Sequence, residues 1–478
     1  MTKGLEVSEI HISQAHRAHY DFRLDSEFYS QANLRKEDAI KRLPHKALNQ
    51  IADLIAGPFG SAITAAQYDA ASRYRYIRAT DVKSFFINEN SPVYVQESTF
   101  NAFPQFHLRE GDILLTVVGM HFGKSAIIYE ADCPSIFSCK STLIRDAKVN
   151  PWYLLTYLSC AIGHGLIRRG QRGAAQPGIN LSDIATVLVP ILSNELQTQV
   201  EALIKHSRSL VIQSHSVYGA AEMLLLTTLG MAGYSPAEET INVKSLMDSF
   251  HLTGRIDAEY YQPKYEQIIS RIKATTHAAL SDLVSIVKSI EPGSDAYTED
   301  ENGLPFLRVA DYSKYGINSP QKCLTASFVS ANKAELDALM PKKNTILFSK
   351  DGSVGEAYCL REDANLVTSS AILHLTVRDP SVVLPDYLTL ALNSILVKMQ
   401  AERDAGGSVI LHWRTNEISN VVVPLVAMAT QQEIAELLKQ SFELKAKSER
   451  VLDVARRVVE IAIEKDENSA LAFLKAQV

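Results

Sequence analysis

The sequence predicts an α+β protein built from two copies of one module. Two long antiparallel coiled-coil helices are expected between the modules, with a pseudo-two-fold axis relating the two halves. Two observations lead to this prediction. The chain of 478 residues repeats its own motifs in the same order at a nearly constant spacing. Each repeat also ends in a heptad pattern, which is typical of a long paired helix.

The internal repeat extends over four motif pairs. They are RLDSEFY (23–29) and RIDAEYY (255–261), YIRATD (76–81) and FLRVAD (306–311), GMHFG (119–123) and GSVG (352–355), and LVP (188–190) and VVP (422–424). The offsets lie between 230 residues (311 − 81) and 234 residues (424 − 190). Loops absorb drifts of this size, and the unit is far longer than a solenoid repeat, so the pattern indicates a duplicated domain.

A heptad pattern follows each Val-Pro. One seam of large apolar residues is expected to pair the helices, and it consists of Leu203, Leu210, Val217 and Leu224 in the first half and Leu437, Leu444, Val451 and Val458 in the second. A parallel seam carries mainly Ser and Ala, which allow close helix approach. The stretch 195–229 would span roughly 50 Å at ~1.5 Å per residue, enough for a fixed spacer. The alternative is that each helix packs only on its own module.

The pattern divides the chain into four parts: a first module with an N-terminal bracing segment at 1–193, a spacer helix at 194–232, a second module with its bracing segment at 233–428, and a second spacer helix with a tail at 429–478. Apolar runs that end in Gly predict buried strands at 111–119 and 343–352, with further strands at 125–129 and 356–360. Helices are expected at 151–168 and 385–402 in the modules. Bracing helices are expected at 40–55 and 265–287.

The overall composition is that of an ordinary globular protein, with 46% hydrophobic and 21% charged residues. The sequence contains no apolar run of the length of a membrane span and no secretion signal at its start, so we expect a cytoplasmic protein. Five cysteines without CxxC spacing are expected to be reduced thiols. The net charge of −6 argues against a protein that coats nucleic acid indiscriminately, although local basic surfaces remain possible.

Basic residues concentrate at corresponding places in the two modules, among glycines and tyrosines. The candidates are Arg73, Arg75, Arg78, Lys124, Arg168, Arg169 and Arg172 in the first module, and Arg308, Lys350, Arg403 and Arg414 in the second. Such loops suit DNA, because arginine binds phosphate or guanine in a bidentate way and glycine lets backbone N–H groups approach phosphates. For a single arginine the alternative is a solvated face with ion pairs. In RRGQRG (168–173), however, three arginines lie within five residues and have no acidic neighbour in the sequence.

Motifs of common enzymes are missing from the sequence. It contains no GxSxG, HExxH, Walker A or GxGxxG motif, so no catalytic residues are predicted. The histidines do not fall into metal-ligand spacings apart from His11, His16 and His19, which we expect to be solvated, so no metal site is predicted. The chain is therefore expected not to be an enzyme.

Several motifs resemble those of the specificity subunit of type I restriction-modification systems. They are GPFGS (57–61), YIRATDV (76–82), GDILLTVVG (111–119), RGAAQPGINLSDI (172–184), LVP (188–190) and the glutamine-rich helix starts at Gln197, Gln199, Gln431 and Gln432. The likeness covers nearly the whole chain. The second half departs most, with EPGSD (291–295) in place of GPFGS and GGSVILHWRTNEI (406–418) in place of the long loop motif.

This resemblance implies a non-catalytic protein whose two target-recognition domains bind the halves of a bipartite, asymmetric DNA site, with the helices setting the gap. It also implies partners. Two adenine-N6 methyltransferase subunits would bring S-adenosylmethionine, and restriction subunits would bring ATP and Mg, so no cofactor is expected on this chain. Two alternatives remain open: a scaffold that binds proteins through its paired modules, and a stand-alone DNA-acting enzyme such as a nuclease or glycosylase.

Overall fold

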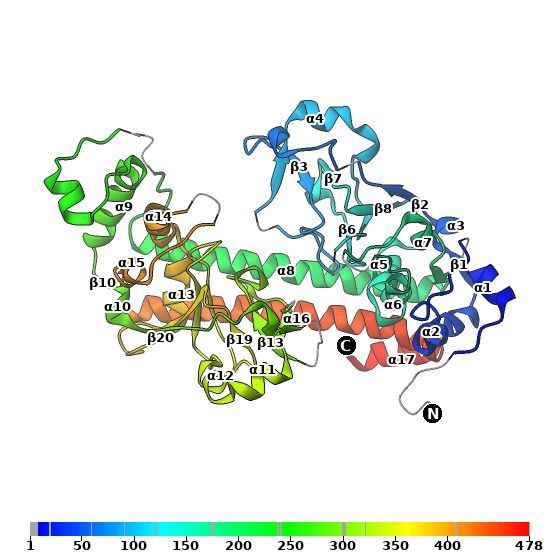
Figure 1. Cartoon of the computed structure of the whole chain (residues 1–478). Helices are drawn as coiled ribbons and strands as arrows, with labels where there is room; N and C mark the ends of the chain where they lie inside the picture. The colour runs from blue at the N-terminus through cyan, green and yellow to red at the C-terminus, as the bar shows by residue number, and fades with distance from the viewer. Residues whose placement is uncertain are drawn as a thin grey trace. The chain divides into compact units, whose positions relative to one another are not determined.

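A computed structural model describes residues 8–18, 21–58, 60–89, 91–119, 122–173, 176–236, 239, 241–298, 303–320, 322–407 and 410–477. The chain forms two compact units, which we call unit 1 (residues 1–210 and 446–478) and unit 2 (residues 211–445). Each unit mixes helices and sheets, so the predicted α+β class is confirmed (Figure 1). The predicted boundaries leave the long helices outside the modules, whereas each compact unit includes a stretch of both long helices.

The described residues of unit 1 form three sheets. A four-stranded antiparallel sheet has the order β2 (Asp53–Ala56), β8 (Ser141–Arg145), β5 (Ile113–Thr116) and β6 (Ser125–Ile127). A three-stranded sheet has the order β4 (Val93–Val95), β3 (Tyr74–Ile77) and β7 (Ser135–Phe137), and β3 runs parallel to β7. A ribbon joins β1 (His45–Ala47) to β9 (Leu188–Pro190). Every residue of β5, β6 and β7 is buried, as their continuous apolar runs require.

Unit 2 repeats this plan. Its four-stranded antiparallel sheet has the order β11 (Val284–Lys288), β20 (Ile372–Val377), β17 (Ile346–Ser349) and β18 (Ala357–Cys359). A second sheet has the order β12 (Tyr297–Thr298), β16 (Lys322–Leu324), β13 (Leu304–Leu307) and β19 (Val367–Thr368), with β13 again parallel to β19. Two ribbons join β10 (His277–Ala279) to β21 (Val422–Pro424) and β14 (Tyr312–Ser313) to β15 (Gly316–Ile317).

The strand registers agree with the sequence repeat. His45 lies opposite Pro190 in the ribbon of unit 1, and His277 lies opposite Pro424 in that of unit 2. These pairs are separated by offsets of 232 (277 − 45) and 234 (424 − 190) residues. The one parallel strand pair of each unit also occupies the same place in both sheets. The duplication therefore extends from the motifs to the strand pairing.

Shorter helices complete each unit. In unit 1 they are α1 (Ile12–Ala18), α2 (Gln31–Lys41), α3 (Leu48–Ile51), α4 (Glu97–Ala102), α5 (Pro151–Ser159), α6 (Ala161–Arg169), α7 (Leu181–Ala185) and α17 (Glu467–Gln477). In unit 2 they are α9 (Pro263–Lys273), α10 (Leu280–Leu283), α11 (Ala326–Ala331), α12 (Lys333–Leu339), α13 (Pro385–Asn393), α14 (Ile395–Asp404) and α15 (Thr415–Ser419). None of the described helices has the length and apolar character that a membrane crossing requires.

The predicted helix at 151–168 is two helices, α5 and α6, that meet at Cys160. The backbone of Cys160 is extended, and its Sγ accepts a hydrogen bond from the Gly163 N–H at 3.5 Å. Gly163 packs against the preceding helix so closely that an added Cβ would lie 2.0 Å from the Tyr157 carbonyl oxygen. The prediction at 385–402 has the same outcome, since α13 and α14 meet at Ser394.

The bracing helix predicted at 40–55 is wrong over most of its length, and the one predicted at 265–287 is interrupted by strands. Helix α2 ends at Lys41, and Pro44 disfavours helical backbone at the residue before it. The apolar residues that follow enter β1, α3 and β2 instead. In unit 2 the helix α9 ends at Lys273, the chain then enters β10, and the short helix α10 is followed by β11. In both places the ribbon with β9 or β21 satisfies backbone groups that a helix would otherwise have paired.

Two long helices, α8 (Asn194–Thr228) and α16 (Met428–Glu464), contribute to both units. In unit 1 the hydroxyls of Ser207 and Ser448 lie 2.7 Å apart. Ser193, just before α8, donates from its backbone N–H to Glu467, just after α16, at 2.9 Å. From the first contact to the second, the residue number falls along α8 and rises along α16. The two helices are therefore antiparallel here, as predicted.

The same pairing occurs in unit 2, where the hydroxyls of Ser214 and Ser441 lie 3.1 Å apart. The buried seam is the predicted seam of small residues, in which Ser207, Ser214, Ser441 and Ser448 are at most 2% exposed. Of the eight large residues predicted to pair the helices, Leu210 and Val458 are buried. The other six are half-buried: Leu203, Val217, Leu224, Leu437, Leu444 and Val451. The large residues therefore flank the close contact between the helices instead of filling it.

Candidate nucleic-acid interface

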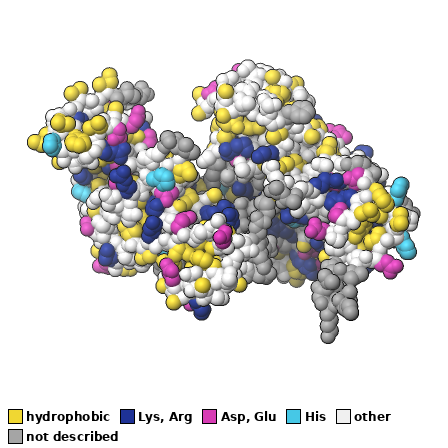
Figure 2. All heavy atoms as spheres, viewed as in Figure 1, with side chains coloured by type: hydrophobic (Ala, Val, Ile, Leu, Met, Phe, Trp, Pro, Cys, Tyr) yellow, Lys and Arg dark blue, Asp and Glu magenta, His cyan; other side chains and the backbone are white. Residues whose placement is uncertain are grey.

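Lys and Arg side chains in Figure 2 lie among Asp and Glu side chains on the face shown, and they do not form one continuous basic surface. The eleven predicted DNA-binding residues must therefore be judged by their individual contacts. They fall into three groups: arginines fixed by a neighbouring carboxylate at the surface, arginines buried in ionic networks, and cations without a carboxylate among their described contacts.

Arg78 and Arg308 form the same surface fork in the two units. Arg78 donates from its backbone N–H and its Nε to Asp81, both at 2.9 Å, which raises the pKa of the guanidinium. Arg308 donates from the same two groups to Asp311, at 3.0 and 3.2 Å. Each arginine side chain is 36% exposed. The carboxylate fixes the direction of the guanidinium, and the exposed part can meet a phosphate or a base edge.

Arg73 and Arg75 flank Tyr74 but have different surroundings. Arg73 is exposed, with its guanidinium 5.2 Å from the centre of the Tyr74 ring and 3.2 Å from its hydroxyl. Arg75 is 11% exposed and forms an ion pair with the buried Asp132 at 3.3 Å. Its guanidinium also donates to the carbonyl oxygen of Asn88. Arg73 is thus available at the surface, whereas Arg75 holds the interior of unit 1 together.

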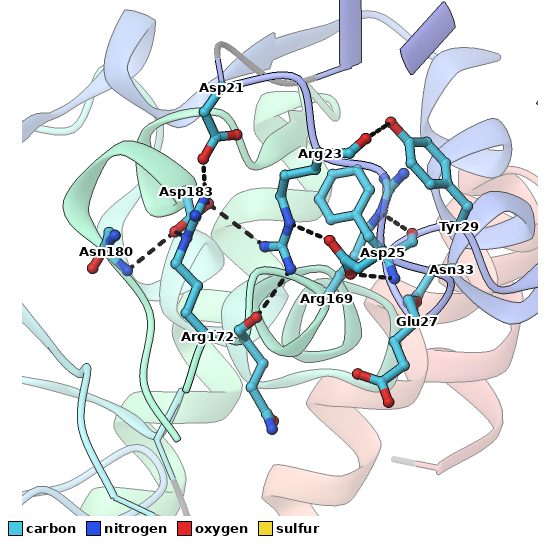
Figure 3. A network of polar contacts seen from close by, with 12 residues as sticks. Asp21, Arg23, Asp25, Glu27, Tyr29, Asn33, Arg169, Arg172, Asn180 and Asp183 are labelled. Atoms are coloured by element: carbon cyan, nitrogen blue, oxygen red, sulfur yellow. Dashed lines mark hydrogen bonds and ion pairs between the residues drawn. The ribbon is translucent and has the colours of Figure 1, made fainter. Parts of the chain in front are cut away.

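Two of the three arginines of RRGQRG, Arg169 and Arg172, have acidic partners in the fold, although the sequence places no acidic residue beside them. Figure 3 shows Arg172 between two carboxylates. Its Nε and Nη2 donate to Asp183, each at 2.7 Å, and Nη2 also lies 2.7 Å from Asp21. Arg169 forms an ion pair with Glu37 and is 8% exposed. Asp21 and Glu37 are distant from these arginines in the sequence but adjacent to them in the fold.

Arg23 completes this network, and we call the contacts of Arg23 with Asp25, Tyr29 and Gln171 the arginine clamp (Figure 3). Arg23 donates from Nε to Asp25 at 2.7 Å and from Nη2 to the Gln171 carbonyl oxygen at 3.0 Å. The Tyr29 hydroxyl donates to the Arg23 carbonyl oxygen at 3.0 Å. The clamp fastens the repeated RLDSEFY motif to the loop that follows α6.

Unit 2 contains the same clamp. Arg255 donates to Asp257 and, at 3.2 Å, to the Asp404 carbonyl oxygen, while Tyr261 donates to the Arg255 carbonyl oxygen at 3.1 Å. Arg403 occupies the place of Arg169 and pairs with Asp404 at 2.6 Å. Gly406 occupies the place of Arg172, and a cavity of about 490 Å³ opens there. Its lining includes Arg255, Asp404, Gly406, His412, Arg414 and Glu417.

The remaining candidates of unit 2 lie around this loop. Lys350 forms an ion pair with Asp351 and is 16% exposed. Asp351 also lies 2.9 Å from Nδ1 of His412. Arg414 is exposed, and among its described contacts only its backbone N–H bonds a carboxylate, that of Glu417 at 3.1 Å. Arg414 is therefore the candidate of unit 2 that is best placed to meet a phosphate.

Four cationic side chains of unit 1 lie close enough to His164 to lower its pKa: Lys36, Lys124, Arg168 and Arg456. Burial, followed by these cations, lowers the pKa of His164 to about 4. Burial also lowers the pKa of Lys124. Lys124 and Arg168 are predicted from the sequence, but Lys36, His164 and Arg456 are not. No local pattern could identify them, because they come from α2, α6 and α16.

Reactive cysteines and metal-ligand clusters, two features typical of a catalytic centre, are not found among the described residues. All five cysteines are free thiols, and burial raises the pKa of Cys160 and Cys359 to about 12, which makes them poor nucleophiles. Among the described residues, no three His, Cys, Asp or Glu side chains form a group that could hold a metal ion. The described polar features of both units include the arginine clamps and forks, in which carboxylates and carbonyl oxygens of the chain orient the arginine side chains.

Comparison with known proteins gives a family match in the second half of the chain. Residues 276–452 match the family described as type I restriction modification DNA specificity domain. This range includes the sheets of unit 2 and most of α16. A search of curated proteins gave no match.

Several solved structures are similar to most of the chain. A type I restriction-modification S subunit from M. genitalium shares 12% identity, with a TM-score of 0.35, and the match covers 88% of this chain and 95% of that one. The HsdS subunit from Thermoanaerobacter tengcongensis shares 17% identity, with a TM-score of 0.28 and coverage of 88% and 96%. A chain from a study of type I R-M complex assembly and conformational transition shares 16% identity, with a TM-score of 0.29 and coverage of 89% and 99%.

Proposed function

We propose that the chain is a non-catalytic specificity subunit of a type I restriction-modification system, whose DNA specificity domain matches residues 276–452, and that its two units bind the two halves of a bipartite, asymmetric DNA site. One observation supports this proposal above the others. Units 1 and 2 repeat the same sheets, the same arginine clamp and the same surface fork, within a family whose domain is described by DNA specificity. Two similar binding modules in one chain suit a target with two parts.

Within each unit, the cations that reach the surface are the residues that would contact DNA: Arg73 and Arg414 are exposed, and the others are half-buried. Arg73, Arg78, Lys124 and Arg168 serve unit 1, and Arg308 and Arg414 serve unit 2. Some of these side chains would bind phosphates and so position the duplex, and others would bind base edges in the major groove. Arg75, Arg169, Arg172, Lys350 and Arg403 instead stabilise the loops that carry these cations, since each is paired with a carboxylate and is at most 31% exposed.

The proposed partners follow from the family. Two adenine-N6 methyltransferase subunits would supply S-adenosylmethionine, and restriction subunits would supply ATP and Mg. The methyltransferase would modify the site that this chain selects. We place the complex in the cytoplasm, where the reducing environment suits the five free thiols.

Methylome sequencing tests the two-part target directly. Cells that express this chain with its cognate methyltransferase should carry N6-methyladenine in one split motif with a fixed gap. Exchanging residues 46–189 for those of a homologue should change one half-site and leave the other and the gap intact. A single continuous motif, or a change in both half-sites, would contradict the proposal.

The long helices offer a second test. Seven residues inserted after Leu210 and after Leu444 keep the heptad register and add roughly 10 Å at ~1.5 Å per residue. We expect the methylated motif to keep both half-sites and to gain a longer gap. If the half-sites changed while the gap stayed the same, the helices would not be the spacer.

A further inference from the structure

The cations around His164 come from four segments of unit 1 that meet at one place. An added Cβ at Gly165 would lie 2.2 Å from Nζ of Lys36, so this ammonium group lies against the backbone of α6. On the same helix, Arg168 places its guanidinium 4.3 Å from the centre of the Phe122 ring. An added Cβ at Gly123 would lie 3.2 Å from Nε2 of His164. The turn that carries Lys124 therefore touches the helix that carries His164 and Arg168.

The helix α16 completes the group with Arg456. Its Nη2 donates to the hydroxyl of Ser84 at 3.2 Å, and its guanidinium lies 4.8 Å from the centre of the Phe85 ring. The backbone N–H of Phe85 in turn donates to the carbonyl oxygen of Ser125, next to Lys124, at 2.9 Å. Arg456 also pairs with Asp453, a carboxylate that is 71% exposed. We call Lys36, Lys124, Arg168 and Arg456 the cationic cluster.

Unit 2 has acidic residues at three of these four positions. With the repeat offsets of 232 and 234 residues, Lys124 corresponds to Glu356, Arg168 to Glu402 and Arg456 to Glu222. Backbone bonds support the match, because the N–H of Lys124 donates to the Thr116 hydroxyl at 3.0 Å and that of Glu356 donates to the Ser349 hydroxyl at 2.9 Å.

The acidic residues of unit 2 are neutralised by lysines. Glu222 pairs with Lys314 at 2.8 Å, and Lys314 occupies the place of Ser84. Glu402 pairs with Lys264 at 2.7 Å, and Glu356 lies 3.9 Å from Lys398, which occupies the place of His164. One half of the duplicated scaffold thus has four cations at a place where the other half has three carboxylates paired with lysines.

We propose that the cationic cluster of unit 1 binds a phosphate of the DNA backbone, and that unit 2 has no equivalent site. The proposal rests on the proposed DNA-binding function and makes it asymmetric. Bringing cations together is unfavourable unless an anion joins them, and a polyanion such as DNA supplies closely spaced phosphates. A neutral His164 can donate one N–H to the same phosphate without adding to the repulsion between the cations.

Salt-dependent DNA binding tests the proposal. The full chain in complex with its methyltransferase is titrated with a labelled duplex that carries its motif, at several salt concentrations. The double variant Lys36→Gln, Lys124→Gln should bind about tenfold more weakly at low salt, and its log–log slope against salt should fall by about 2. The matched control Lys264→Gln, Lys398→Gln removes two lysines from unit 2, and its slope should equal that of the wild type.

Further measurements separate the possible outcomes. Lys124→Arg should restore most of the slope, and circular dichroism of each variant checks that it is folded. Equal slopes for the unit 1 variant and the wild type would overturn the phosphate site, even though the methylome still showed a two-part motif. Protection of Lys36 and Lys124 from acylation by an acidic polypeptide or by inorganic phosphate, but not by the duplex, would overturn it too. Loss of motif-specific binding by the wild-type complex would instead refute the proposed function.

Discussion

Units 1 and 2 share a clamp but differ in what surrounds it. Arg23 and Arg255 make the same hydrogen bonds to an aspartate, a tyrosine and a loop carbonyl. In unit 1 the space beside the clamp is filled by Arg172, which lies between Asp183 and Asp21. In unit 2 the equivalent of Arg172 is Gly406, and a cavity remains.

This difference separates the scaffold from the part that varies. The clamp joins the motif before the module to the loop after α6 or α14, and both units need that connection. The loop itself carries different charges in the two halves, as does the place occupied by the cationic cluster in unit 1. A protein whose halves recognise different sequences requires this combination of a constant frame and variable surfaces.

Removing the carboxylate that lies beside the clamp should affect the two units very differently. The Asp183 carboxylate is 1% exposed and lies beside the guanidiniums of Arg172 and Arg23. Asp183→Ala removes this carboxylate, and breaking a buried ionic network lowers the free energy of unfolding by about 3–5 kcal/mol. Glu417→Ala, at the same place in unit 2, removes a half-buried carboxylate beside a cavity and should cost at most about 1 kcal/mol. Urea unfolding of the full chain measures both changes.

Hydrogen exchange assigns the loss to one unit. In Asp183→Ala, exchange should rise at residues 21–29 and 170–185, while the equivalent segments of unit 2 keep the protection of the wild type. Equal destabilisation by the two variants would mean that the cavity of unit 2 does not weaken its clamp, and the comparison between the units would fail.

Acid should destabilise both units through one buried histidine each. The pKa values of His164 and His374 are lowered from 6.5 to about 4, by burial and cations in the first case and by burial alone in the second. Because the unfolded state binds protons more tightly, stability is lost as the pH falls from about 6.5 towards 4. Between pH 7 and 5 each histidine should cost about 2 kcal/mol of unfolding free energy. His164→Gln and His374→Gln should each remove the part of this acid-dependent loss of stability that comes from the replaced histidine.

A titration followed by NMR distinguishes the causes. Lys124→Ala takes away one cation near His164, so the pKa of His164 should rise while that of His374 stays constant. If both values moved, or neither did, the cationic cluster would not act on His164 as its geometry requires.

The sequence predicted the duplicated architecture well because the same short motifs occur in both halves of the chain in the same order. The two modules, the antiparallel pairing and the strands at 113–116 and 346–349 follow from patterns within a few residues. The buried face of the long helices was harder to assign, since two seams have the same period of seven. Leu203, Leu224 and Leu437 lie against the apolar cores of their units, and this packing leaves the close contact to the serines.

The site was predicted less well than the fold because charge pairing acts across the chain. Arg169 meets Glu37, 132 residues away, and Arg172 meets Asp21, so their acidic partners could not be recognised from sequence neighbours. The three cations of RRGQRG therefore cannot be neutralised together as a pure test of DNA binding, because that change would also break the ionic network of unit 1. Arg73, Arg78 and Lys124 are better sites for such a test.

The smallest predicted effect concerns the serine pairs of the long helices, where the two units should behave alike. Ser207 and Ser448 donate to each other's carbonyl oxygens in unit 1, at 3.3 and 3.1 Å, and Ser441 donates to the Ser214 carbonyl oxygen at 2.8 Å in unit 2. Ser207→Ala and Ser214→Ala should each lower the free energy of unfolding by about 1 kcal/mol, because a net hydrogen bond is lost without creating a large cavity.

The double variants Ser207→Ala, Ser448→Ala and Ser214→Ala, Ser441→Ala should cost little more than the single ones, because both partners of each hydroxyl pair are then apolar. The exposed Ser216 is the control, and its replacement by Ala should leave the urea midpoint unchanged. A cost in unit 1 several times that in unit 2 would show that the helix contact is not equivalent in the two halves. The asymmetry of the molecule would then extend from its loops and cationic cluster into the helices that both units share.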